Sequence, residues 1–287
     1  MVRSIVIILL MGVGLQFIAG SNCAARVWGE ADSGTPQDST GIEFTSKILK
    51  KEQAEGEAYA WYLFHCGWAV KTSSKLLIFD YTRGLWRYQV EPPVRSLSNG
   101  WINPKEIKDL DVYVFVSHSH HDHYDSTIFN WKDTIANITY FFGWSEAEGQ
   151  AYNNMVGPRA SFVNDDIEVY TINSHHSGVP EVAYLVKTDD MAIYHGGDYN
   201  ADYKADFAYL KTCTDDLDVA MMNDWCGDPI MEPINNFNPK LILPGHFGAK
   251  EQEPRKLPSC YEALGLAGEV KCARQRGDMF KYDPDQH

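Results

Sequence analysis

A dense histidine cluster follows a strand-like apolar run near the middle of the chain. Residues 118–123 read His-Ser-His-His-Asp-His and hold four of the ten histidines in the 287-residue sequence. The run before them, 112–116, reads Val-Tyr-Val-Phe-Val, which is typical of a buried β-strand. Imidazole nitrogens and a carboxylate suit zinc, iron, manganese or nickel. The fold must therefore bring these side chains together where a strand ends.

The spacing within the cluster predicts half of a two-metal site. Side chains two residues apart in an extended segment point the same way, so His118 and His120 can bind one metal ion together while His121 points elsewhere. As the chain then turns toward a helix, Asp122 and His123 can reach a second position.

Three further strand ends carry candidate ligands. They are His175-His176-Ser177-Gly178, His195-Gly196-Gly197-Asp198, and the run from Leu241 that ends in Pro244-Gly245-His246. The paired glycines allow the backbone to come close to a metal ion or a substrate. Residue spacing alone leaves the choice between His175 and His176 open.

The N-terminus has the layout of a secretory signal peptide. Arg3 is the only charge before an apolar run, and small residues follow it, so we assign 1–21 as a signal peptide of an exported protein, periplasmic or secreted. We expect no stable membrane span after cleavage, because the run is too short to cross a bilayer comfortably. Residues 22–58 read as a polar N-terminal arm, and 59–287 as the folded domain.

Strands and helices alternate along that domain, which predicts an α/β fold with sheets covered by helices. We predict strands over 60–70 and 75–80 around a turn at 72–74, then over 112–116, 138–142, 166–172, 182–187, 191–195, 219–222, 241–243 and near 270. Helices are expected over 46–55, from 103, near 125, and over 145–152, 202–211 and 261–266.

Charge and cysteine content narrow the partners. The formal net charge is −14, and such a surface repels polyanions, so we expect no nucleic-acid partner. Export permits disulfides. Cys260 with Cys272, and less strongly Cys213 with Cys226, are close enough in sequence to close short loops. Neither the charge nor the cysteine content fixes an oligomeric state, and the small-molecule or lipid substrate that we expect follows from the motifs below.

The order of the motifs resembles the metallo-β-lactamase superfamily. Within it, the chain is most similar to the branch of L-ascorbate-6-phosphate lactonases and N-acyl-phosphatidylethanolamine phospholipase D enzymes. The resemblance covers roughly residues 59–282 and is carried by Phe79-Asp80, the 118–123 cluster, His176-Ser-Gly, Tyr194-His-Gly-Gly-Asp198 and Pro244-Gly-His246. It implies a four-layer αββα sandwich with two metal ions at one edge.

The resemblance also implies an assignment of residues. His118, His120 and His176 would bind the first metal ion; Asp122, His123 and His246 would bind the second; Asp198 would bridge both. Asp80 would anchor a ligand from behind. Apart from the resemblance, His65 and His195 are candidates for support of the ligands, and the aromatic residues Trp86 and Tyr199 are candidates to line an apolar entrance. We expect two divalent transition metal ions, zinc first, with manganese, iron or nickel accepted by the same ligands.

The activity implied is that of a hydrolase. A hydroxide shared by the two metal ions would attack an ester, lactone or phosphodiester bond, with Asp122 and Asp198 as catalytic residues and Asp122 moving the proton. Alternatives are a non-catalytic metal-binding protein, a β-lactam hydrolase and a redox di-iron protein. The absence of a cysteine beside Asp198 weakens the β-lactam reading, and the absence of a flavin module weakens the redox one.

Overall fold

The computed structural model describes residues 39–84, 91–145, 152–174, 178–199, 203–224, 230–247 and 259–286. The predicted signal peptide lies outside these residues, as does most of the predicted arm. What the structure describes of the arm begins with helix α1, Ser39–Lys50, which starts and ends earlier than the helix predicted over 46–55. No helix in the described ranges is both long enough and apolar enough to cross a membrane.

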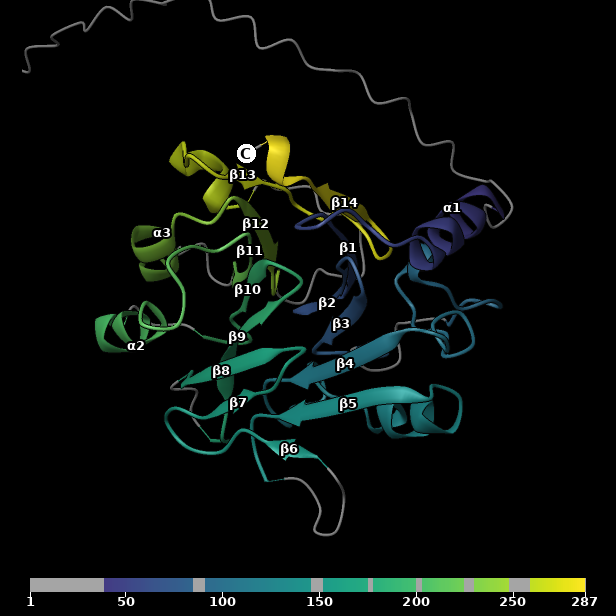
Figure 1. The fold of residues 1–287 in the computed structure, drawn as a ribbon, viewed down its shortest axis with the longest axis horizontal. Coiled ribbons are helices and arrows are strands. Elements are labelled where there is room, and N and C mark those ends of the chain that lie inside the picture. The colour runs from purple at the N-terminus through teal and green to yellow at the C-terminus, as the bar shows by residue number, and fades with distance from the viewer. Residues whose placement is uncertain are drawn as a thin grey trace, which may run out of the picture. The chain divides into compact units, whose positions relative to one another are not determined.

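Two seven-stranded sheets form the body of the domain (Figure 1). The first has the order β14-β1-β2-β3-β4-β5-β6, with β1 Ala58–Phe64, β2 Gly67–Lys71, β3 Lys75–Phe79, β4 Asp111–Val116, β5 Asn137–Phe142, β6 Asn153–Asn154 and β14 Met279–Tyr282. The second has the order β13-β12-β11-β10-β9-β8-β7, with β7 Ser161–Val163, β8 Glu168–Asn173, β9 Val182–Thr188, β10 Met191–His195, β11 Val219–Asn223, β12 Leu241–Gly245 and β13 Glu269–Val270.

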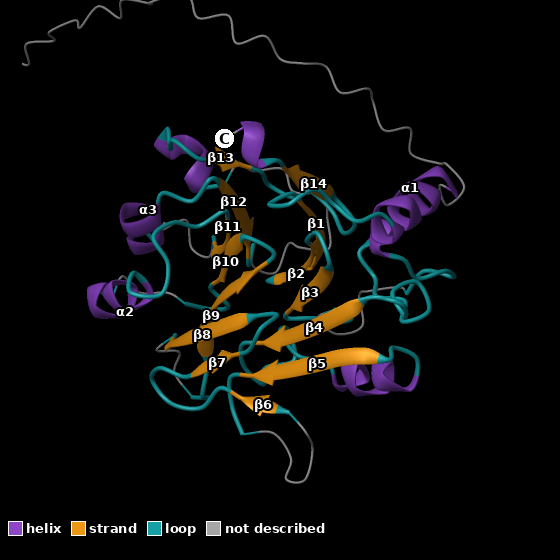
Figure 2. Ribbon diagram, viewed as in Figure 1, coloured by secondary structure: helices purple, strands orange, loops and turns teal. Residues whose placement is uncertain are grey.

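Apolar side chains fill three layers around these sheets. One layer lies between the sheets and joins residues such as Trp68 and Phe115 of the first to Tyr184 of the second. The outer face of the first sheet packs against α1 and the 3₁₀ helix Ser126–Asp133. The outer face of the second packs against α2, Lys204–Leu210, and α3, Glu232–Phe237. Helices therefore cover both outer faces (Figure 2), as the αββα prediction requires.

Strand direction brings the candidate ligands to one edge. β3, β4 and β5 are parallel in the first sheet, and β10, β11 and β12 are parallel in the second. β1 has the same direction as β3 because both are antiparallel to β2. The carboxyl ends of these strands consequently carry His65, Asp80, the 118–123 cluster, residues 196–198 and His246.

Local expectations failed where they rested on short signals. The apolar run 60–70 is two strands, β1 and β2, separated by a tight turn at His65-Cys66. Asn103-Pro104 opens only turns, because the polar residues after it bury just Ile107 on the sheet. The chain over 261–266 forms only a 3₁₀ helix, Tyr261–Leu264. The helix expected over 145–152 falls mostly outside the described residues.

The prediction of a disulfide between Cys260 and Cys272 is wrong. The structure does not join these two cysteines. Instead the Cys260 thiol donates to Oδ1 of Asp224, and the Cys260 amide donates to the same oxygen at 3.1 Å. Closeness in sequence was therefore a poor guide to cysteine pairing, because Asp224, directly after β11, holds Cys260 in place. Cys226, the partner predicted for Cys213, lies outside the described residues.

Candidate metal centre

The histidine cluster leaves β4 as an extended segment and then turns. Side chains alternate as the spacing predicts: His118 is fully buried, His120 is half-buried, and Ser119 and His121 are exposed. Nε2 of His118 lies 3.0 Å from Nδ1 of His120, so both rings offer nitrogen to the same point. The His123 amide donates to the carbonyl of His120 at 3.0 Å, which turns the chain back toward the site.

Asp198 lies between two groups of these nitrogens. Its Oδ1 is 3.1 Å from Nε2 of His123 and 3.1 Å from Nε2 of His246. Its Oδ2 is 3.9 Å from Nε2 of His118. The two oxygens of one carboxylate thus face the two ligand groups that the sequence predicted.

A glycine makes this position of Asp198 possible. Gly197 has φ +55°, and a Cβ there would come within 2.8 Å of Cβ of Ser117 and 2.9 Å of Oε1 of Glu181. A larger residue would push the loop after β10 away from the loop after β4. The Gly-Gly-Asp motif therefore lets the two sheets meet at the site.

Asp80 supports the cluster from behind. It is fully buried; its Oδ1 accepts from the Ser117 amide at 2.7 Å, and its Oδ2 accepts from the Ser117 hydroxyl at 2.7 Å and from Nδ1 of His123 at 2.8 Å. Burial alone would raise the pKa of Asp80, but the charge of His195 and the hydrogen bond and charge of His123 hold it below its usual range. Asp80 therefore stays ionised and orients His123 with Nε2 toward Asp198.

Buried carboxylates and imidazoles in the site stabilise each other's charged forms. Burial lowers the pKa of His123, yet the charge of Asp198 and the hydrogen bonds to Asp198 and Asp80 outweigh it and raise that pKa well above its usual value. Burial likewise raises the pKa of Asp198, but His123 and His246 hold it far below its usual range. Buried carboxylates here demand positive charge, which imidazolium or a bound cation can supply.

Sequence reasoning missed Glu181. This glutamate is buried at the start of β9; its Oε1 accepts from the Asp198 amide at 2.7 Å and lies 3.2 Å from Nδ1 of His118. It therefore fixes both the ring of His118 and the loop of Asp198. An acidic residue opening an otherwise apolar strand, just after Pro180, was the available signal.

The remaining predicted site residues divide into three groups. His65 lies beside His123 and His246. His195 is packed behind the site, stacked on Phe79, with Nε2 2.9 Å from the carbonyl of Cys66. Tyr199 does not line a substrate entrance, because it is 1% exposed and packs on Phe207 of α2. Trp86, His175 and His176 lie outside the described residues.

The convergent donors fit divalent transition metals. Four overlapping sets of described residues place possible ligand atoms within 4.8 Å of one another: His118, His120 and Asp122; His65, Asp122, His123 and His246; His65, Cys66, His123 and Asp198; and His118, Glu181 and Asp198. Mixed imidazole and carboxylate donors are the set that zinc, manganese, iron and nickel accept. The residues present therefore fit the binding of divalent transition-metal ions.

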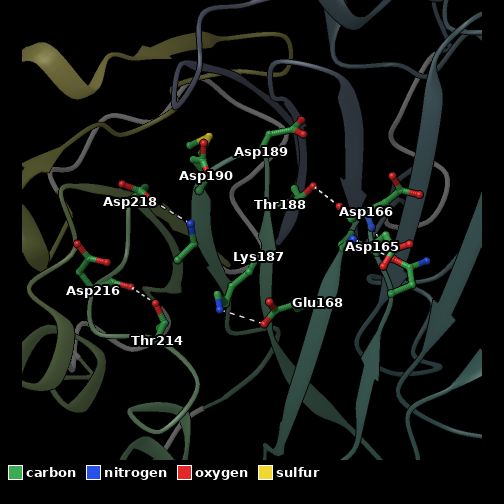
Figure 3. A pocket seen from close by; sticks show the side chains of 14 residues that line it. Asp165, Asp166, Glu168, Lys187, Thr188, Asp189, Asp190, Thr214, Asp216 and Asp218 are labelled. Carbon is green, nitrogen blue, oxygen red and sulfur yellow. Dashed lines mark hydrogen bonds and ion pairs between the residues drawn. The ribbon is translucent and has the colours of Figure 1, made fainter.

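A hollow of about 490 Å³ lies at the edge of the second sheet opposite the donor cluster (Figure 3). It is lined by carboxylates, but several are already paired: Glu168 with Lys187 at 3.0 Å, Asp189 with Lys75 at 2.8 Å, and Asp218 with Lys240 at 2.8 Å. These pairs neutralise much of its charge, so the donor cluster at the carboxyl ends is the better candidate for a functional site.

The two facing sheets, with helices on both outer faces, form the αββα sandwich of the metallo-β-lactamase fold, and the donor cluster lies at one edge of it. No protein-family model and no curated protein matches the sequence. Solved structures share the fold. A metal-dependent hydrolase from Parabacteroides distasonis has a TM-score of 0.51 at 13% identity, over 76% of this chain and 94% of that one. The metallo hydrolase Igni18 from Ignicoccus hospitalis has a TM-score of 0.51 at 17% identity, over 79% and 99%.

A mutant of the β-hydroxylase CmlA has a TM-score of 0.52 at 8% identity, over 78% of this chain and 53% of that one. CmlA from Streptomyces venezuelae is described as a diiron enzyme. At these identities the likenesses concern the fold, and they confirm the predicted αββα architecture.

Proposed function

We propose that the protein is a di-metal hydrolase that cleaves an ester, lactone or phosphodiester bond in a small or lipid substrate. The observation that carries the proposal is the place of Asp198, with Oδ1 toward His123 and His246 and Oδ2 toward His118. A carboxylate with a donor set on each side is suited to bridge two cations. His176 would complete the first set.

The cations would supply a strong nucleophile from water near neutral pH and would polarise the bond to be cleaved. The chain's own part is to hold and move the proton. Burial raises the pKa of Asp122, but the hydrogen bond from His65 and the charge of His123 hold it well below its usual range. Asp122 is therefore ionised and half-buried among the proposed ligands. Its position in the ligand set, not its basicity, places it to take a proton from the attacking water.

The finer assignments rest on sequence. The motifs support a place in the branch of ascorbate-6-phosphate lactonases and N-acyl-phosphatidylethanolamine phospholipase D enzymes, which favours a lactone or a phosphodiester over a β-lactam. The apolar run before residue 21 supports export to the periplasm or the medium. Mass spectrometry of the protein recovered outside the cytoplasm should find the first 21 residues, or close to that number, removed.

A substrate screen tests the proposed activity. Purified protein is stripped with a chelator and reloaded with zinc, manganese, nickel or, without oxygen, ferrous iron. It is then assayed on lactones, phosphodiesters, phospholipids and a chromogenic β-lactam. We expect turnover on one class that chelation abolishes and metal restores.

His121→Ala is the matched control, since this exposed histidine lies within the same cluster. It should retain turnover, whereas Asp198→Ala should lose it. Two bound metal ions without turnover on any class would contradict the hydrolase proposal and favour a non-catalytic metal-binding protein.

A further inference from the structure

The turn between β1 and β2 reaches from the first sheet to the strand ends of the second. The carbonyl of His65 accepts from the His246 amide at 3.1 Å. The carbonyl of Cys66 lies 2.9 Å from Nε2 of His195, and the Cys66 thiol donates to the carbonyl of Gly197 at 3.6 Å. One short turn therefore holds the ends of both β10 and β12, so its own side chains have fixed positions at the site.

The backbone of this turn is unusual at His65. The residue has φ +56°, in the left-handed region that residues other than glycine seldom adopt. His246, which faces it, has φ +57°. Position 245, next to His246, favours glycine because a Cβ there would come within 2.9 Å of the His65 carbonyl oxygen. A conformation of this kind at a non-glycine residue is found most often where function requires the side chain to point one way.

The side chain of His65 points at the second set of ligands. It is 2% exposed, and its ring centroid lies 4.0 Å from that of His246 and 4.9 Å from that of His123. Its Nε2 is 3.4 Å from Oδ2 of Asp122. Donor atoms of all four residues lie within 4.8 Å of one another.

These distances match those expected between ligands of one ion. Ligands about 2.1 Å from a metal ion are about 3.0 Å apart in an octahedral shell and about 3.4 Å apart in a tetrahedral one. The separation of His65 from Asp122 is 3.4 Å, and Asp198 is 3.1 Å from both His123 and His246. His65 is therefore close enough to Asp122 to bind the same ion.

We propose that Nε2 of His65 is a further ligand of the second metal ion, beside Asp122, His123 and His246. The inference rests on the proposed di-metal centre. With this ligand the second set has one more imidazole than the metallo-β-lactamase resemblance assigns to it. The second ion would accordingly be held by more protein atoms than the first.

The test is a metal titration of three full-length variants, read by calorimetry and by the visible spectrum of bound cobalt. His65→Phe keeps a planar ring but offers no nitrogen. His65→Gln keeps an amide N–H that can hydrogen-bond Asp122 but has no imidazole. His195→Gln is the comparison for a residue behind the ligands, because His195 is equally buried and touches the same turn but belongs to no set of possible ligands.

The wild-type protein should bind two equivalents. Both His65 variants should lose the second equivalent or bind it more than about 100-fold more weakly, beyond the tenfold to hundredfold effect typical of a residue behind the ligands. The cobalt spectrum should change with them, whereas the first equivalent should keep wild-type behaviour and His195→Gln should weaken the second by no more than about 100-fold. Circular dichroism of the metal-free proteins checks that each variant is folded.

Two results overturn the inference while leaving the di-metal centre intact. One is wild-type binding of both equivalents by His65→Phe. The other is full recovery by His65→Gln, which would make His65 a hydrogen-bond donor to Asp122 only. A wild-type protein that never takes a second equivalent would instead refute the di-metal centre and this inference with it. If His65→Phe fails to fold, His65→Gln decides: loss of the second equivalent makes His65 a metal ligand, and its retention makes His65 a hydrogen-bond donor to Asp122.

Discussion

Oδ2 of Asp80 lies 2.8 Å from Nδ1 of His123, and this contact joins the end of β3 to the ligand cluster after β4. The same oxygen accepts from the Ser117 hydroxyl, whose oxygen lies 3.0 Å from Nδ1 of His118. One buried carboxylate thus orients a ring from each proposed ligand set. The two sets are therefore linked through Asp80 as well as through Asp198.

Replacing Asp80 with asparagine should weaken metal binding by about 10–100-fold, because ligating imidazoles depend on such carboxylates for their orientation. Competition with a chromophoric chelator measures the affinity. Asp218→Asn is the control: Asp218 is also buried, but it bonds to the Ala192 amide and Lys240 at the far edge of the second sheet. Equal affinities for the two variants would show that Asp80 serves only folding.

Asp122→Asn should lower turnover by at least about 100-fold beyond what lost metal explains, since positioned proton transfer typically contributes 10² to 10⁴-fold. The side chain keeps its shape but no longer accepts the proton. Metal content and rate are measured on the same sample. A variant that holds its metal and keeps near wild-type rates on the best substrate would make Asp122 a ligand only.

His176→Ala should lower both metal occupancy and activity, and His175→Ala should have a much smaller effect. Ser177 and Gly178 after His176 match the motif of the resembling family, which places the ligand at 176. The paired variants are compared by elemental analysis after identical dialysis. The opposite ranking would shift the ligand assignment by one residue.

Asp189→Asn should destabilise the fold by about 1–3 kcal/mol at pH 7, a cost typical of hydrogen bonds to a charged group. Asp189 accepts from Lys75 Nζ at 2.8 Å, the Thr72 hydroxyl at 2.6 Å and the Ser74 amide at 2.9 Å, joining a turn of each sheet. Burial raises its pKa, but the bonds from Lys75, Thr72 and Ser74 hold it well below its usual range.

Because the folded pKa is depressed, this stabilisation is present above the ordinary value of about 3.9 and is lost as the pH falls toward the folded pKa. The gap between wild type and variant should therefore narrow below about pH 4. Urea unfolding of both proteins at several pH values, with a chelator present, measures this difference in the free energy of unfolding. Asp165→Asn, an exposed carboxylate on the same hollow (Figure 3), should shift stability by less than about 0.5 kcal/mol. A stability difference between wild type and Asp189→Asn that stays the same from pH 7 to below about pH 4 would refute the role given to the charge of Asp189.

The places of most strands along the chain, and the alternation of side chains within the cluster, were predictable from the sequence because they depend on local patterns. Buried runs such as 112–116 mark strands. The alternation of His118 and His120 with exposed neighbours follows from the two-residue period of extended chain. These features need no knowledge of distant contacts.

The rest of the site depends on contacts between the sheets. Glu181 reaches His118 because the amide of Val182, the next residue, donates to the Ser117 carbonyl at 3.2 Å across the two sheets. His65 lies in a turn hidden within one apolar run, and its left-handed backbone has no sequence signal such as glycine. Partners of this kind become visible only when the sheets are packed together.

Metal stoichiometry tests the central claim most directly. The purified wild-type protein is saturated with zinc, dialysed against metal-free buffer and analysed for metal per chain, with Asp198→Ala treated in parallel. We predict two equivalents in the wild-type protein and no more than one in the variant, because Asp198 lies between both donor sets. A wild-type protein that binds at most one equivalent, or a variant that keeps two, would contradict the di-metal centre.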